Sequence, residues 1–136
     1  MDWMYPYLSP HGLILKVHRK PLAGISEKTV MTDRAYWRGQ TKRLLGDWLT
    51  NETPVKALCE FVENVYGQSL LEGFKGDEDY VLATRGRNTQ YLYAHLRNGQ
   101  GHVYEWRMNH AETPAEKERM LRELDFVYRQ AIALCP

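Results

Sequence analysis

Apolar side chains recur every three or four residues over the last part of the chain, which is the spacing of one face of an α-helix. These positions are Met120, Leu121, Leu124, Val127, Tyr128, Ala131 and Leu134. The run follows Thr113-Pro114-Ala115-Glu116, which has a threonine cap, a proline in the first helical position and a glutamate three residues after the cap. The sequence therefore predicts a helix from Pro114 that stops only at Pro136. We expect its last apolar turn to pack against a further element of a longer chain.

Two further helices are predicted in the first half of the chain. Ser26 is a suitable N-cap for a helix over residues 27–45, and Gly46 is a suitable stop. The apolar positions at helical spacing in this segment are Val30, Trp37 and Leu44. Thr53-Pro54 predicts a second start, with the threonine as cap and the proline as first helical residue, and Gly67 ends that helix.

The region from residue 68 to residue 112 leaves alternatives open. Residues 68–79 are rich in turn formers, and Asp79 is a candidate cap for a short helical turn. Asn88 is the predicted cap of the next helix. Gly99 and Gly101 each disfavour a helix by up to about 1 kcal/mol relative to alanine. Either packing by the apolar residues that follow carries one helix through, or the helix splits here.

The first 25 residues form a segment of a different character. Trp3, Tyr5 and Tyr7 alternate along a proline-rich stretch, which is typical of an extended strip lying on the core. Residues 12–18 read as a short strand. Its partner is either residues 3–8 or an element outside this chain. We therefore expect an extended aromatic segment with a short strand over 1–25, and a helical domain over 26–136, within one domain that is a fragment of a longer protein.

Charge and composition exclude several classes. The 136 residues contain 18 Lys and Arg against 17 Asp and Glu, so no global charge draws the chain to nucleic acid. No stretch approaches the roughly 18 apolar residues of a membrane helix, and no signal-peptide core is present. We expect the isolated chain to be soluble.

No motif for catalysis, a cofactor or a metal is present. Cys59 and Cys135 fall on apolar sides of predicted helices and are expected to be buried free thiols. His95 and His102 can share a helix face, but a zinc site requires further ligands. An enzyme that uses either histidine with a nearby acid is a third, weaker hypothesis. The chain itself is therefore predicted not to be an enzyme, and no cofactor is expected.

Two sets of residues are candidates for binding. The candidate anion-binding residues are the basic positions Arg34, Arg38, Lys42, Arg85 and Arg87. They support a free-standing nucleic-acid-binding protein as the alternative function, although a solvated helix face is the favoured explanation for the first three, because acidic residues balance the charge of the chain as a whole. The candidate partner-binding residues are the aromatic positions Trp3, Tyr5, Tyr7, Trp37, Trp106 and Tyr128. Exposed aromatic patches are typical of protein interfaces.

The last helix resembles the second helix of a tetratricopeptide repeat. Leu124, Tyr128, Ala131 and Pro136 occupy the places of that repeat's small, bulky, small and proline positions, with Leu124 departing from the usual small residue. One partial repeat predicts a repeat-like helical hairpin and not an array.

A wider resemblance covers most of the chain. It is carried by Asp2-Trp3-Met4-Tyr5-Pro6, Pro10-His11-Gly12-Leu13-Ile14, Trp48, Gly73-Phe74-Lys75-Gly76-Asp77 and Ala131-Ile132-Ala133-Leu134-Cys135-Pro136. Together these are similar to the soluble C-terminal segment of polytopic bacterial protein O-mannosyltransferase-like glycosyltransferases of Verrucomicrobia and Planctomycetes, a membrane family with a domain of unknown function.

The resemblance implies a parent anchored in a bacterial membrane, with the extracytoplasmic side favoured, and a reaction centre outside these residues. Its implied partners are the parent's membrane domain and the helical repeats that follow, or a separate protein. The sequence as a whole thus predicts a mostly α fold and a non-catalytic interaction or scaffold module.

Overall fold

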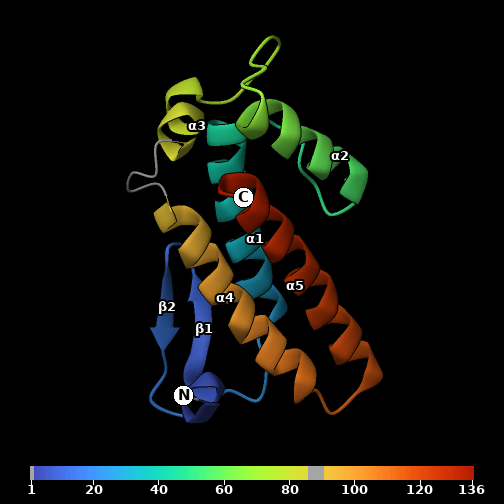
Figure 1. The fold of residues 1–136 in the computed structure, drawn as a ribbon. Coiled ribbons are helices and arrows are strands. Elements are labelled where there is room, and N and C mark those ends of the chain that lie inside the picture. The colour runs from blue at the N-terminus through green and yellow to red at the C-terminus, as the bar shows by residue number, and fades with distance from the viewer. Residues whose placement is uncertain (1, 86–90) are drawn as a thin grey trace.

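The computed structural model describes residues 2–85 and 91–136. In chain order its elements are the 3₁₀ helix η1 (Asp2–Tyr7), β1 (Leu8–His11), β2 (Ile14–Val17), α1 (Glu27–Leu45), α2 (Val55–Phe61), the π-helix η2 (Val62–Gly67), α3 (Glu78–Arg85), α4 (Tyr91–Asn109) and α5 (Pro114–Leu134). The predicted mostly α fold is confirmed, with one short antiparallel hairpin near the N-terminus (Figure 1). Within the described residues, no helix combines the length and the apolar character that crossing a membrane requires.

Helices α4 and α5 form an antiparallel hairpin at the centre of the fold (Figure 1). The predicted cap of α5 is confirmed, because Oγ1 of Thr113 accepts a hydrogen bond of 3.2 Å from the backbone N–H of Glu116. Helix α4 runs without a break through Gly99 and Gly101. A Cβ atom on Gly101 would lie 2.7 Å from Cε1 of Tyr128, so the missing side chain allows the two helices to approach closely.

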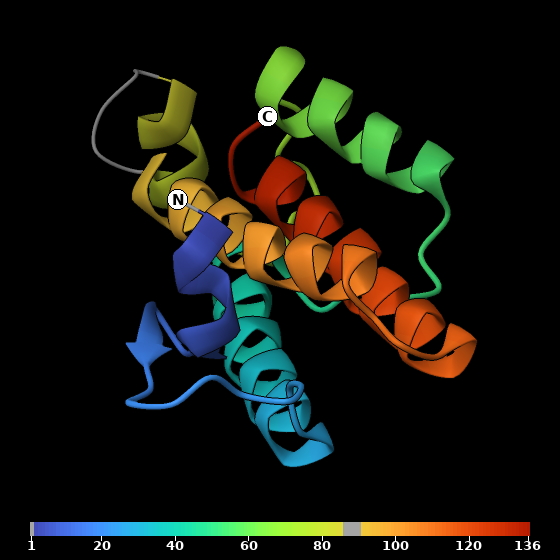
Figure 2. The same ribbon diagram turned by 90° about the horizontal axis from the view of Figure 1, so that it is seen from below.

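Helix α1 packs against the α4–α5 pair and completes the core (Figure 2). Its predicted ends are confirmed, since the Ser26 side chain accepts from the N–H of Thr29 and the Gly46 N–H bonds the carbonyl of Lys42. Two apolar clusters fill the interior. The first has Trp37, Leu44, Leu58, Tyr66, Tyr80, Phe126 and Leu134 among its members. The second includes Leu8, Val30, Val103, Tyr104, Met120 and Val127.

The N-terminal segment differs in part from the prediction. Residues Asp2–Tyr7 form η1, so the extended strip expected from the alternating aromatic residues is wrong there. The strand over residues 14–17 is paired within the chain, and its partner is 8–11, not 3–8. Gly12, with φ of +61°, makes the turn between the strands. The alternation of aromatic residues was misleading here, because no residue of η1 is buried and Trp3 is 73% exposed.

The segment from Thr53 to Asp79 forms the end of the fold near the C-terminus (Figure 1). The hydroxyl of Thr53 accepts from Thr50 N–H and donates to the Trp48 carbonyl, so it closes a turn and does not cap α2. The predicted cap is therefore one position off, and Pro54 occupies the cap position without a side-chain hydrogen bond. The helix continues through η2 to Gly67, as predicted.

Helix α3 is capped by Asp77, not by Asp79, since Oδ1 of Asp77 accepts from the Tyr80 N–H at 3.0 Å. The predicted cap of α4, Asn88, lies outside the described residues.

Both cysteines are free thiols, but Cys59 is exposed and Cys135 is half-buried, so the expectation that both are buried is wrong. Helix α2 contacts the core through Leu58, the residue before Cys59.

Candidate functional site

A buried ion pair lies between α1 and α4. Arg97 Nη1 is 2.8 Å from Oδ2 of Asp33, and each side chain is only 1% exposed. The same carboxylate oxygen accepts a hydrogen bond of 2.9 Å from the hydroxyl of Tyr104. Burial, with the Asp33 charge adding to it, raises the pKa of Tyr104 far above its usual value. The phenol therefore stays neutral and serves as a donor.

Two glutamines extend this pair into a cluster. Oε1 of Gln130 on α5 accepts from Nε of Arg97 at 2.8 Å. Oε1 of Gln100 accepts from Nη1 of Arg97 at 2.9 Å and from the indole N–H of Trp37 at 2.7 Å. Its amide nitrogen donates to the carbonyl of Gly12 at 2.6 Å, in the N-terminal hairpin. The guanidinium carbon of Arg97 also lies 5.0 Å from the centre of the Trp37 ring. We call Asp33, Trp37, Arg97, Gln100, Tyr104 and Gln130 the buried polar cluster.

The buried polar cluster joins α1, α4, α5 and the N-terminal hairpin, and it is closed to solvent. Buried polar groups require specific partners, so such a cluster fixes the register of the elements that contribute to it. Oδ1 of Asp33 and Nε2 of Gln130 are buried there without a hydrogen-bond partner in the described structure. The arrangement suits a structural role, since no substrate reaches it.

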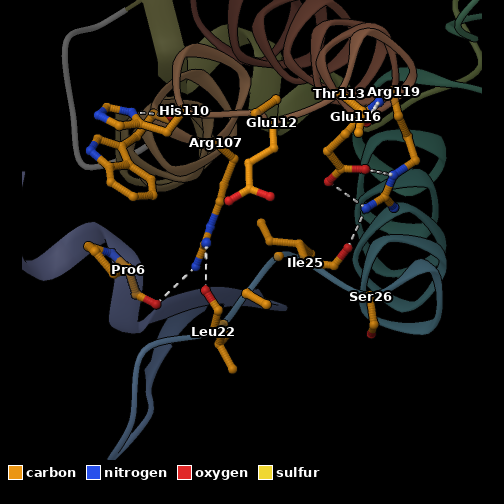
Figure 3. Close-up of a pocket in the computed structure, with 14 residues that line it drawn as sticks. Pro6, Leu22, Ile25, Ser26, Arg107, His110, Glu112, Thr113, Glu116 and Arg119 are labelled. Atoms are coloured by element: carbon orange, nitrogen blue, oxygen red, sulfur yellow. Dashed lines mark hydrogen bonds and ion pairs between the residues drawn. The ribbon is translucent and has the colours of Figure 1, made fainter.

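A surface hollow of about 610 Å³ lies between the N-terminal segment and the turn from α4 to α5 (Figure 3). Arg107 extends into the wall of this hollow and donates to the carbonyls of Pro6 and Leu22, both at 2.9 Å. Burial lowers the pKa of Arg107. On the other side, Arg119 bonds the carboxylate of Glu116 and the carbonyl of Ile25. These contacts hold the N-terminal segment onto the helices.

Two titratable side chains around the hollow, Glu116 and His110, are engaged by other groups of the protein. Glu116 is committed to Arg119, and that hydrogen bond is the main cause that raises the pKa of Arg119. Nδ1 of His110 lies 2.9 Å from the carbonyl of Trp106, so it donates there, and the two rings are stacked with centres 4.0 Å apart. In the described residues, no group of three or more His, Cys, Asp or Glu side chains is placed to hold a metal ion.

Two other hollows differ in chemistry. An apolar one of about 510 Å³ lies between the end of α1 and η2, with the rings of Trp48, Phe61 and Phe74 in its lining. The rings of Trp48 and Phe61 are in contact, with centres 4.4 Å apart. A charged groove of about 800 Å³ runs between α1 and α5, with Arg34 and Arg38 among its lining residues.

The predicted anion-binding residues mostly have acidic partners. Arg34 forms an ion pair with the buried Glu123. Arg38 and Lys42 both lie near Asp47, at 3.9 Å and 3.2 Å. The side chain of Arg85 and the whole of Arg87 lie outside the described residues. The structure therefore brings Arg34 and Arg38 into one groove, but it also supplies the carboxylates that neutralise them.

The predicted partner-binding residues separate into different environments. Trp37 is fully buried in the polar cluster, so the prediction that it contacts a partner is corrected. Tyr5 stacks on Trp106 with ring centres 6.2 Å apart. Tyr128 is half-buried, and its hydroxyl is 3.4 Å from Glu105. Tyr7 is half-buried, and Trp3 is 73% exposed.

Sequence reasoning missed the role of three side chains on α4. Arg97, Gln100 and Arg107 share the face of α4 that also carries Tyr104, because the intervals are three, four and three residues. Charged residues on an otherwise apolar helical face are rarely buried without partners. The polar and charged residues on this otherwise apolar face were the sequence signal for a buried polar cluster. The sequence did not identify their partners, which lie about 60 to 100 residues away along the chain.

With the geometry described, comparison with known proteins adds no relative. No family model, curated protein or solved structure matches this chain.

Proposed function

We propose that this chain is a non-catalytic helical interaction or scaffold module of a membrane-anchored, glycosyltransferase-like bacterial protein. The observation that carries the interaction role is a stripe along α5. Leu121, Tyr128 and Ile132 are seven and four residues apart, so they fall on one line of the helix. Leu121 is 50% exposed and Ile132 is 46% exposed, while Tyr128 is half-buried between them. We call these three residues the α5 stripe.

A partly exposed apolar stripe at this spacing is the kind of surface that another helix covers. In arrays of helical hairpins, each pair of helices buries such a face against the next pair. The α4–α5 hairpin has that form, and the tetratricopeptide-like spacing lies on the same helix. The buried polar cluster supports a scaffold role as well, since it holds three helices in one arrangement before any partner binds.

The nucleic-acid-binding alternative has less support. Arg34, Arg38 and Lys42 each have a carboxylate within 4 Å, which reduces the positive charge available to phosphates. The parent assignment, in turn, is supported only by the sequence resemblance. The two parts of the proposal are therefore tested separately.

The interaction role is tested on the 136-residue chain by light scattering and by binding of an apolar dye. We expect the wild type to associate or to bind dye, and the double variant Leu121→Glu/Ile132→Glu to lose most of that signal. The matched control is Lys117→Glu/Arg122→Glu, which changes exposed side chains of the same helix and should retain the signal. A wild type that stays monomeric and dye-silent would contradict the proposal.

The parent assignment is tested in cells that produce the protein from its native gene. An antibody raised against this chain should detect a polypeptide far larger than 16.0 kDa in the membrane fraction. A free species of about that mass outside the membrane fraction would refute it.

A further inference from the structure

One end of the N-terminal hairpin combines exposed cations with exposed apolar side chains. We call Trp3, Lys16, Val17, Arg19 and Lys20 the basic hairpin end; all five are exposed. Trp3 is 73% exposed and Val17 is 64% exposed.

Backbone pairing brings the two halves of this surface together. Val17 is opposite Leu8, and His18 N–H bonds the carbonyl of Tyr7 at 2.8 Å. The Leu22 N–H then bonds the Pro6 carbonyl, also at 2.8 Å. Residues 17–22 therefore run beside the end of η1, one turn from Trp3, at the end of the hairpin away from Gly12 (Figure 1).

The charge of this region differs from that of the rest of the chain. Residues 2–25 contain three of the 18 Lys and Arg and one of the 17 Asp and Glu, which leaves 15 basic against 16 acidic residues in 26–136. In the part of the chain that the structure describes, Lys16, Arg19 and Lys20 form no ion pair, whereas six of the nine cations of α1 and α5 do. The one acid of the segment, Asp2, lines a hollow with Tyr5 and Glu105.

The backbone beneath this surface is held firmly. Arg107 binds the carbonyls of Pro6 and Leu22, and Gln100 binds that of Gly12. The side chains of Ser9 and His18 are joined across the hairpin at 2.8 Å. The exposed side chains therefore project from a backbone segment that these hydrogen bonds hold in place.

We propose that the basic hairpin end docks on an anionic lipid surface. Lysine and arginine side chains attract the negative headgroups of such a surface. Tryptophan is suited to the boundary between headgroups and acyl chains, because its ring is apolar and its N–H is polar. The proposal rests on the charge and exposure of this segment and does not depend on the α5 stripe or on the assigned parent.

An acidic peptide added to the edge of β2 fits less well. That strand has only four residues, and about half of its backbone groups face outward. Trp3, Arg19 and Lys20 all lie outside it, so strand addition would leave most of the surface uncovered.

The test uses the 136-residue chain and sedimentation with lipid vesicles. We expect binding to vesicles that mix phosphatidylglycerol with phosphatidylcholine, little binding to phosphatidylcholine alone, and weaker binding at high salt. The variant Lys16→Glu/Arg19→Glu/Lys20→Glu should lose binding by about tenfold or more. The control Lys28→Glu/Lys56→Glu/Lys117→Glu reverses the same number of exposed cations elsewhere and should bind like the wild type.

Trp3 provides a second readout. Quenching by brominated lipid should be strong in the wild type and weak in Trp3→Phe, because Trp37 is buried and Trp48 and Trp106 are half-buried. Equal loss of binding in both charge variants, or quenching that persists in Trp3→Phe, would overturn the proposal. Binding of RNA but not of vesicles, lost in the hairpin variant, would also overturn it and identify a nucleic-acid surface.

Discussion

Arg97 of α4 and Asp33 of α1 form an ion pair of 2.8 Å in which both side chains are almost completely buried. The desolvation of the two charges is offset by hydrogen bonds from Arg97 to two glutamines and from Tyr104 to the carboxylate. The pair is therefore part of a cluster, and removing one member leaves the others buried without their partner.

Removing one charge of this pair should be strongly destabilising. We expect Asp33→Ala to lower the free energy of unfolding by about 3–5 kcal/mol, because the Arg97 charge would remain buried without compensation. The double variant Asp33→Leu/Arg97→Met should cost less than the sum of the two single changes. Urea denaturation of all variants measures this. The control is Arg38→Ala, at an exposed ion pair, which should change the free energy of unfolding by less than about 1 kcal/mol. Additive effects of the changes at Asp33 and Arg97 would show that the two side chains are not coupled.

The two glycines of α4 should respond in opposite directions to alanine. Gly101→Ala places a Cβ 2.7 Å from the Tyr128 ring and should destabilise the fold by about 1–3 kcal/mol. Gly99→Ala meets no atom within 4 Å and should stabilise it by about 0.5–1 kcal/mol through better helix propensity. Thermal unfolding followed by circular dichroism compares them. Stabilisation by Gly101→Ala as well as by Gly99→Ala would mean that α4 and α5 do not approach as closely as described.

Loss of the α5 cap should weaken the central hairpin. Thr113→Ala removes the acceptor for the Glu116 N–H and should cost about 1 kcal/mol, whereas Thr113→Gly should cost only a few tenths. Lys117→Ala, in the same first turn but without a cap contact, is the control. Chemical denaturation measures the three variants. A cost for Lys117→Ala equal to that for Thr113→Ala would point away from capping as the cause.

Stability should fall at high pH because of buried tyrosines. Tyr66 and Tyr80 donate to the carbonyl of Leu134 at 3.2 Å and 2.8 Å, and Tyr66 also donates to that of Ala133 at 2.6 Å. Burial raises the pKa of both phenols above the usual value of about 10. A group with a raised pKa contributes its stability in full below the pKa of the unfolded chain, and that contribution is lost as the pH rises beyond it.

We therefore expect the urea midpoint to be constant near neutral pH, to begin to fall as the pH approaches about 10, and to keep falling as the pH rises further toward the raised pKa of the folded state. Tyr66→Phe should lower stability at neutral pH by about 1 kcal/mol per lost hydrogen bond, and it should make the alkaline decrease shallower. Tyr7→Phe is the control and should leave the pH dependence unchanged. A pH dependence that is identical in Tyr66→Phe and the wild type would contradict the assignment.

The sequence by itself determined the elements whose signals are local. Ser26 and Thr113 accept hydrogen bonds from backbone N–H groups three residues away, and the repeat of apolar residues on α5 depends only on helix geometry. These features were predicted correctly because the interacting groups, such as a capping side chain and the N–H that it binds, lie within one helical turn. The same reasoning failed by one position at Thr53, whose hydroxyl closes a neighbouring turn, and by two positions at Asp79, because Asp77 caps α3.

Only the tertiary structure decided what depends on distant partners. The end of η1 is held against α4, because Arg107 donates to the carbonyl of Pro6, which lies 101 residues away along the chain. Gly101 is tolerated within α4 because Tyr128 of α5 packs against it. Trp37, which by residue type alone was a candidate for the surface, is buried in the core, where Gln100 of α4 accepts its indole N–H. Burial and partner choice depend on which segments meet in the folded chain, and the residue spacing within one segment does not contain that information.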